Sequence, residues 1–375
     1  MTRYGFALCW IAFLTSSKVW GGESVLFSVT QKGITVSATN RASKEGLPVD
    51  ETKTEIFAIN LETGTKRLVF SDEKSNIVLL PEGGARAGIV TGGGKVFAVA
   101  MDRQEVANAH GTSAVYELST DGSGRSRKIF EVDNFAHLFV NPSGSEIGYM
   151  PGDTTETHIV IRDTASTKLL RQAELFRRTI EAESVSRIDW MPDGKAIYFA
   201  LAGGLDDEET LWSTPNSPIG TYLMNEDSGS VERLAPEAAL HPKISGLQPL
   251  PDAAAVLIGR LADGSYFLSD TEYDATSSRQ IVHFYALDLS KRTQKLFHFQ
   301  RGDNPHLAPS GDKVVLTISP ENDQKQPTFK ATSTVDIWVM ELGSGRQAKL
   351  FSFSAPDVTN AKGPWMNLIG WLQEQ

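Results

Sequence analysis

The sequence predicts an all-β fold, a β-propeller of six four-stranded blades. Three observations lead to this prediction. A short turn motif rich in Pro, Asp, Ser and Gly recurs at intervals of about 50 to 60 residues, a spacing typical of propeller repeats. Apolar residues in alternation follow each copy, as in a strand. Two further alternating segments joined by a short polar turn come next, and this pattern is typical of a β-hairpin.

The closest copies of the turn motif share Pro at the first position and Gly at the third. They are PSGSEI at 142–147, PDGKAI at 192–197 and PSGDKV at 309–314, with looser copies GGGKVF at 92–97 and PDAAAV at 251–256. Pro and Gly supply the backbone angles of a tight turn, and the apolar residues after it begin the next strand. Each copy therefore connects the first strand of a blade to the second.

The hairpin segments supply the third and fourth strands of each blade. They lie at 55–70, 113–130, 158–170, 221–234, 283–297 and 336–351. A four-stranded sheet cannot cover both of its faces alone, whereas blades stacked in a ring bury each other's faces. Six blades follow from these copies, and seven is the alternative.

The two ends of the chain offer two ways to close the ring. The C-terminal segment LIGW (368–371) is similar to RIDW (187–190), which begins a blade. It is therefore expected to supply the inner strand of the blade that residues 24–40 begin. Alternatively, residues 25–29 form that inner strand and the C-terminal segment packs beside it.

Residues 1–21 have the pattern of a secretory signal peptide. Arg3 gives a positive start, residues 4–14 are apolar, and Val19 and Gly21 suit a cleavage site. The apolar run is too short for a bilayer, which needs about 20 residues. Residues 22–375 are then expected to form a single propeller domain in the periplasm or outside the cell, with no membrane span in the mature chain.

Composition excludes several classes of protein. The chain has 375 residues, of which 40% are hydrophobic and 22% charged, so it is not a disordered protein. Its 36 Lys and Arg against 46 Asp and Glu give a net charge of −10, which argues against nucleic-acid binding. A single cysteine, Cys9, excludes a disulfide framework and a cysteine zinc site.

The segment DWMPDGKAIYFAL (189–201) resembles the repeat of TolB-type six-bladed propellers, the WD40-like PD40 repeat, roughly W-S-P-D-G-K-x-I-A-F. DIWVMELGSGRQAKLF (336–351) is similar to the hairpin that follows in that repeat. The resemblance covers essentially all of the mature chain and implies the fold, with little about activity. The repeats begin directly after the signal segment, so the extra N-terminal domain of TolB itself is not expected.

No motif in the sequence carries catalytic chemistry. The nucleophile-elbow pattern G-x-S-x-G does not occur, and none of the seven histidines forms an H-x-H or H-x-x-x-H pair. No acidic calcium loop is present. We therefore predict no catalytic residue, no metal site and no cofactor, and enzymatic activity is less favoured than binding.

The longest connections are expected on one face of the disc, because strand direction alternates and puts second-to-third and blade-to-blade connections on the same side. They carry acidic and aromatic residues, which suit a sugar, a basic peptide or a partner protein. The predicted ligand-binding residues there are Asp206, Asp207, Trp212, Tyr266, Phe267, Asp270, Glu272 and Tyr273, with Arg187 and His306 lining the channel near the same mouth.

The first functional hypothesis is a non-catalytic extracytoplasmic binding or scaffold module that presents these loops to a protein or a small ligand. The alternative is a lyase or hydrolase acting on carbohydrate, with residues from several blades converging on the channel mouth. A structural subunit of an envelope complex is a third possibility.

Overall fold

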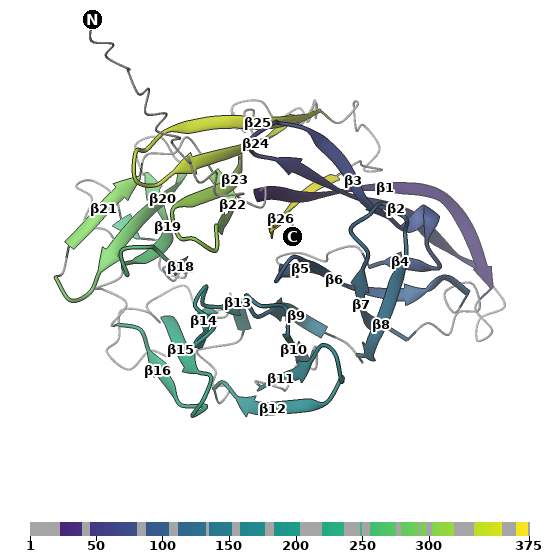
Figure 1. Cartoon of the computed structure of the whole chain (residues 1–375), viewed down its shortest axis with the longest axis horizontal. Helices are drawn as coiled ribbons and strands as arrows, with labels where there is room; N and C mark the ends of the chain where they lie inside the picture. Colours follow the sequence, from purple (N-terminus) through teal and green to yellow (C-terminus); the bar gives the residue numbers. More distant parts are fainter. Residues whose placement is uncertain are drawn as a thin grey trace, which may run out of the picture.

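The computed structural model confirms the predicted fold class, since the chain forms six antiparallel sheets arranged around a central axis (Figure 1). It describes residues 23–39, 46–80, 88–104, 112–132, 135–151, 158–176, 184–202, 220–235, 248–249, 256–274, 279–291, 293–297, 302–318, 334–354 and 365–373. Residues 1–21, predicted to be a signal segment, lie outside these residues. Within them the one helical element of three or more residues is the 3-10 turn η1 (Asp72–Lys74).

The first three blades have these strands, in order from the inner strand outward. Blade 1 contains β26 (Trp365–Gln373), β1 (Glu23–Thr39), β2 (Gly46–Asn60) and β3 (Lys66–Ser71). Blade 2 contains β4 (Ile77–Leu79) with β5 (Ile89–Gly92), then β6 (Lys95–Asp102), β7 (Ala114–Leu118) and β8 (Ser126–Glu131). Blade 3 contains β9 (Phe135–Val140), β10 (Glu146–Pro151), β11 (His158–Asp163) and β12 (Leu169–Glu174).

The other three blades follow the same order. Blade 4 contains β13 (Ser184–Trp190), β14 (Ala196–Ala202), β15 (Gly220–Asn225) and β16 (Val231–Arg233). Blade 5 contains β17 (Gln248–Pro249) with β18 (Val256–Arg260), then β19 (Tyr266–Asp274), β20 (Arg279–Asp288) and β21 (Thr293–Phe297). Blade 6 contains β22 (Gly302–Leu307), β23 (Lys313–Ile318), β24 (Thr334–Glu341) and β25 (Gln347–Ser354).

The C-terminal strand closes the ring. β26 lies innermost in blade 1 and pairs antiparallel with β1, with Val25 opposite Trp371. The first of the two closures expected from the sequence is therefore the one that forms. The Trp371 indole Nε1 donates a 2.9 Å hydrogen bond to the His306 carbonyl oxygen, which joins blade 1 to blade 6.

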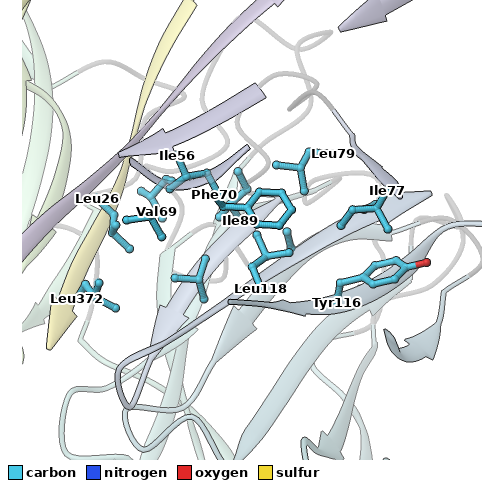
Figure 2. Close-up of a cluster of buried hydrophobic side chains, with 14 of the residues drawn as sticks. Leu26, Ile56, Val69, Phe70, Ile77, Leu79, Ile89, Tyr116, Leu118 and Leu372 are labelled. Carbon is cyan, nitrogen blue, oxygen red and sulfur yellow. The ribbon is translucent and has the colours of Figure 1, made fainter. Parts of the chain in front are cut away.

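Six apolar clusters lie between the six pairs of neighbouring blades. Figure 2 shows the cluster between blades 1 and 2, to which Leu26 and Phe70 of blade 1 and Ile77 of blade 2 belong. The strand β6 explains why each blade needs two neighbours. Its residue Val96 is buried toward blade 1 and its next residue Phe97 toward blade 3, because successive side chains point to opposite faces.

The turns between first and second strands gather on one face of the disc, which we call the turn face. Neighbouring turns touch there, since the Gly93 N–H donates to the Pro142 carbonyl oxygen at 2.8 Å. A Cβ on Gly93 would lie 1.9 Å from the Ser143 carbonyl oxygen, and its φ of +57° also favours glycine. The glycine-rich segment 92–94 is thus explained by close packing of blades 2 and 3.

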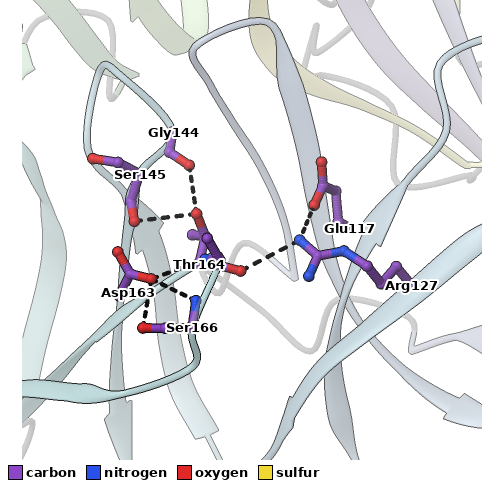
Figure 3. Close-up of polar contacts among 8 residues, drawn as sticks. Glu117, Arg127, Gly144, Ser145, Asp163, Thr164 and Ser166 are labelled. Atoms are coloured by element: carbon purple, nitrogen blue, oxygen red, sulfur yellow. Dashed lines mark hydrogen bonds and ion pairs between the residues drawn. The ribbon is translucent and has the colours of Figure 1, made fainter.

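Polar contacts reinforce this face between the same blades (Figure 3). Arg127 of β8 pairs with Glu117 of β7 and donates a 3.3 Å hydrogen bond to the Thr164 carbonyl oxygen of blade 3. The Thr164 hydroxyl donates to the Gly144 carbonyl oxygen at 2.9 Å. Arg127 therefore reaches from the outer hairpin of blade 2 to the hairpin turn of blade 3.

The opposite face, which we call the loop face, carries two extended hairpins. β26 pairs with β1 only as far as Thr30, and β1 and β2 continue beyond it as a two-stranded hairpin up to Thr39 and Gly46. The hairpin of β19 and β20 also continues to Asp274 and Arg279. Residues 46–54 and 266–274, which were expected to lie in long connections, are therefore strand.

The sequence-based register of blade 5 is wrong. The segment 251–256 was expected to be the turn into the second strand, yet Val256–Arg260 is the inner strand β18. The turn that follows is Leu261–Ser265, closed by a 2.8 Å bond from the Leu261 N–H to the Ser265 carbonyl oxygen. Both segments carry the Asp-containing pattern of a tight turn, and only strand pairing distinguishes them.

We expect Trp371→Ala to lower the free energy of unfolding by about 3–5 kcal/mol, because a buried indole is removed from the ring closure. Trp371→Phe keeps most of the packing and removes the bond to His306, so it is expected to cost about 1 kcal/mol. Urea unfolding measures both. Leu170→Ala, at a side chain 47% exposed, is the control and should cost less than about 0.5 kcal/mol. A loss of stability for Trp371→Ala as small as that for Leu170→Ala would contradict closure of the ring by β26.

Candidate functional site

The inner strands of all six blades surround a cavity of about 540 Å³ on the propeller axis. Inner strands of neighbouring blades contact each other around most of the ring, and between blades 4 and 5 the contact is made by β14 with β18. Its volume falls in the range of about 300–1,000 Å³ that is usual for small-molecule sites. Apolar side chains such as Ile89 and Leu138 share the lining about equally with polar groups.

Arg187 of β13 is the charged group that reaches furthest across the channel. Its Nη2 donates a 3.4 Å hydrogen bond to the Pro305 carbonyl oxygen on β22, two blades away. It is also hydrogen-bonded to the Tyr198 hydroxyl, which itself donates to the Ile258 carbonyl oxygen at 3.0 Å. Burial opposes its charge, but Tyr198 and Asp189 more than compensate, so the pKa of Arg187 lies above its usual value.

Asp189 lies two residues further along β13 and lines the same cavity. Its Oδ1 accepts a 2.8 Å hydrogen bond from the Trp190 backbone N–H. Burial raises the pKa of Asp189 to about 6, although the positive charge of Arg187 and that hydrogen bond act in the opposite direction. A carboxylate with such a pKa is mostly ionised at neutral pH and becomes protonated in mild acid.

His306 of β22 is a neutral imidazole at neutral pH. Burial, and then the positive charge of Arg187, lower its pKa to about 3, while a hydrogen bond to the Leu368 backbone acts against them. A Cβ built on Gly370 would lie 3.4 Å from His306 Nδ1 and 3.6 Å from Thr91 Oγ1. Blades 6, 1 and 2 therefore meet at these three residues, where the absence of a side chain at Gly370 leaves the channel open.

His137 of β9 also lines the channel, but its Nε2 lies 2.9 Å from the Val185 carbonyl oxygen and is engaged in joining blades 3 and 4.

Over the described ranges, no group of three or more His, Cys, Asp or Glu side chains is placed to hold a metal ion. No helix within those ranges is long and apolar enough to cross a membrane.

The structure brings two of the predicted site residues together, Arg187 and His306, and both line the cavity. Their predicted position near the channel mouth on the face of the long connections is wrong. His306 is the last residue but one of β22, and Arg187 is the fourth residue of β13. Because inner strands run from the loop face to the turn face, the polar groups lie in the middle of the channel and toward the turn face.

The predicted residues on β19 fall into two groups. Tyr266 and Phe267 begin the strand at the turn face, so their placement in a loop on the other face is wrong. Phe267 is 0% exposed and packs between blades 5 and 6, and Tyr266 is half-buried under the guanidinium of Arg260. The backbones of Asp270, Glu272 and Tyr273 lie in the half of the hairpin nearer the loop face. Asp206, Asp207 and Trp212 lie outside the described residues.

Sequence reasoning missed Asp189 and Thr91 as channel groups, and Tyr198 as the buried hydrogen-bond partner of Arg187. In the segment RIDW, Asp189 stands two residues after Arg187, and residues two apart in a strand point to the same face. This alternation could have placed Asp189 in the channel beside Arg187. Tyr198 is opposite Asp189 in the β13–β14 register, which only a known strand pairing reveals.

No known family model matches the sequence, and no curated protein matches it either. Among solved structures, TolB from Acinetobacter baumannii is similar with a TM-score of 0.51 and 13% identity, over 94% of this chain and 67% of that chain. A structure assigned to TolB of Agrobacterium tumefaciens has a TM-score of 0.46 at 14% identity, over 89% and 92%. An oligogalacturonate lyase from Vibrio parahaemolyticus has a TM-score of 0.40 at 13% identity, over 86% and 78%. The first of these similarities shows that the fold is a TolB-like six-bladed propeller.

The lowered pKa of His306 predicts a pH-dependent stability. In the unfolded chain the histidine binds a proton below about pH 6.5, whereas the folded chain resists protonation until about pH 3, so stability is lost as pH falls through this interval. The free energy of unfolding of the wild type should therefore fall more than that of His306→Gln between about pH 7 and about pH 4, as measured by urea unfolding.

The comparison with His306→Gln is needed because Asp189 changes the stability with pH in the opposite direction. Its raised pKa stabilises the fold in acid and that contribution is lost as pH rises through about 6. Asp189 is present in both proteins, so its effect cancels to first order in the difference. If the free energy of unfolding depends on pH equally in the wild type and in His306→Gln, the folded protein does not hinder protonation of His306.

Proposed function

We propose that the chain is a non-catalytic, extracytoplasmic binding module that holds a ligand in its central channel. The observation that carries the proposal is the combination of a ligand-sized cavity with polar groups from three blades. These groups are Arg187 and Asp189 of blade 4, His306 of blade 6 and Thr91 of blade 2. Such a combination is typical of binding sites for small molecules.

The rigidity of the ring supports this proposal. Groups on strands that are fixed by two neighbouring blades lose little freedom when a ligand binds, so less of the interaction energy is spent on ordering them. The signal segment 1–21 supports a periplasmic or secreted location, since its pattern directs export. The two extended hairpins on the loop face offer a further surface for a protein partner or a larger ligand.

Filling the channel tests the proposal. Thr91→Trp places an indole next to Gly370 and His306, and we expect it to abolish the rise in melting temperature that a bound ligand causes in the wild type. The measurement is a thermal-shift screen of sugars, sugar acids and short peptides. Thr65→Trp, the same substitution at an exposed hairpin turn, is the matched control and should respond like the wild type. A ligand that stabilises Thr91→Trp as much as Thr65→Trp would contradict binding in the channel.

A carbohydrate-acting lyase or hydrolase is the second candidate function, and Asp189 favours it. A general base works best with a pKa near the operating pH, and burial brings Asp189 closer to that range than an ordinary carboxylate. His306 is a poor base by the same criterion, because its pKa is far below neutrality.

The enzyme hypothesis predicts turnover that depends on Asp189. Incubation with uronate oligosaccharides should release shorter products in the wild type, detected by chromatography, and Asp189→Asn should reduce the rate at least about 100-fold. Asp193→Asn, at an exposed position in the next turn, is the control. The absence of products from the wild type, or equal rates in the two variants, would leave binding as the function.

A further inference from the structure

The geometry points to Arg187 as the group that binds the carboxylate of a small acidic ligand, with a sugar acid as the test case. The inference rests on the proposed function and deepens it, since it names the chemical class that the channel recognises.

Among the described residues, the Arg187 guanidinium hydrogen-bonds to neutral groups only. A buried arginine is normally paired with an acid, because an unpaired charge in the interior is costly. The partners of Arg187 are instead the Pro305 carbonyl oxygen and the Tyr198 hydroxyl. Within the described residues no carboxylate oxygen lies within the 4.0 Å of an ion pair, and Asp189 acts on Arg187 only from a longer distance.

The remaining donors of Arg187 face the channel. A guanidinium has five N–H groups, and the two contacts to Pro305 and Tyr198 leave several without an acceptor among the described residues. Arg187 is partly exposed although it lies on an inner strand, and the space beside it is the channel cavity. None of its nitrogens is among the fully buried, unpartnered atoms of the described residues, so its spare donors face that space.

Such donors select a carboxylate. A planar fork of N–H groups matches the two oxygens of a carboxylate, and charge-assisted bonds of this kind are stronger than neutral ones. Opposite Arg187, the neutral His306 and the Thr91 hydroxyl can exchange hydrogen bonds with hydroxyl groups, and the Trp371 ring adds apolar surface. A carboxylate beside several hydroxyl groups is the pattern of a sugar acid.

The test compares D-glucuronate with D-glucose, which differ by one carboxylate, in titration calorimetry on the full mature chain at neutral pH. The wild type should bind glucuronate at least about 10-fold more tightly than glucose, since bonds to a charged group are worth about 10- to 100-fold in affinity. Arg187→Gln should lose this preference, and Arg187→Lys, which keeps the charge without the fork, should restore part of it.

Stability separates a binding role from a structural one. Replacing a cation that makes no direct ion pair by a neutral side chain is expected to leave the melting temperature of Arg187→Gln unchanged or raised. Arg346→Gln, an exposed arginine on a hairpin turn of blade 6, is the matched control and should retain the preference for glucuronate.

Several results would overturn the inference. They are equal affinity of the wild type for the two sugars, no binding of either, and a preference for glucuronate that survives in Arg187→Gln. Inorganic phosphate that binds as tightly as glucuronate and is lost equally in Arg187→Gln would show a general anion site and overturn the carboxylate assignment. If the channel instead binds a neutral ligand, and Thr91→Trp abolishes that binding, the role of Arg187 is contradicted while binding in the channel is supported. Failure of this inference can therefore be distinguished from failure of the proposed function.

Discussion

The structure depends on one constraint, that a strand buried on both faces needs an apolar neighbour on each side. In blade 2 the alternation of β6 sends Val96 toward blade 1 and Phe97 toward blade 3, and both side chains are fully buried. A row of such sheets would leave an apolar face at each end. A ring has no end, so closing it removes the last two exposed faces.

Closure determines what happens at the ends of the chain and at the turns. β26 completes the sheet that β1 begins, so the first and last described segments fold as one blade and unfolding must separate them. The ring also brings neighbouring turns close on the turn face, where the Gly93 position accepts no side chain and Arg127 bridges to Thr164. The axial cavity is the remaining space, because six inner strands at sheet-packing distance cannot meet at a point.

The sequence predicts the repeat, its strand content and its six blades, because turn residues and alternation are local signals. It also predicts that Arg187 and His306 line the channel, since both stand on first strands of blades. It cannot predict register where two turn-like segments follow each other, as at 251–256 and 261–265 in blade 5. This error in register placed Tyr266 and Phe267 in a loop on the other face, whereas they lie at the turn-face end of a strand. Partners from different blades, such as Arg187 with Pro305, are beyond any local pattern.

The charge of the channel follows from how each polar group is satisfied. The His306 ring bonds the Leu368 backbone beside the positive Arg187 and stays neutral, so it adds a donor or acceptor without adding charge. Asp189 is held by one backbone N–H and not by an ion pair, so its negative charge is only weakly stabilised and is lost in mild acid. Arg187 keeps its charge throughout because the Tyr198 oxygen and Asp189 outweigh its burial. The electrostatic field inside the ring is therefore set by two residues of a single strand, β13, while the other blades contribute neutral groups and shape.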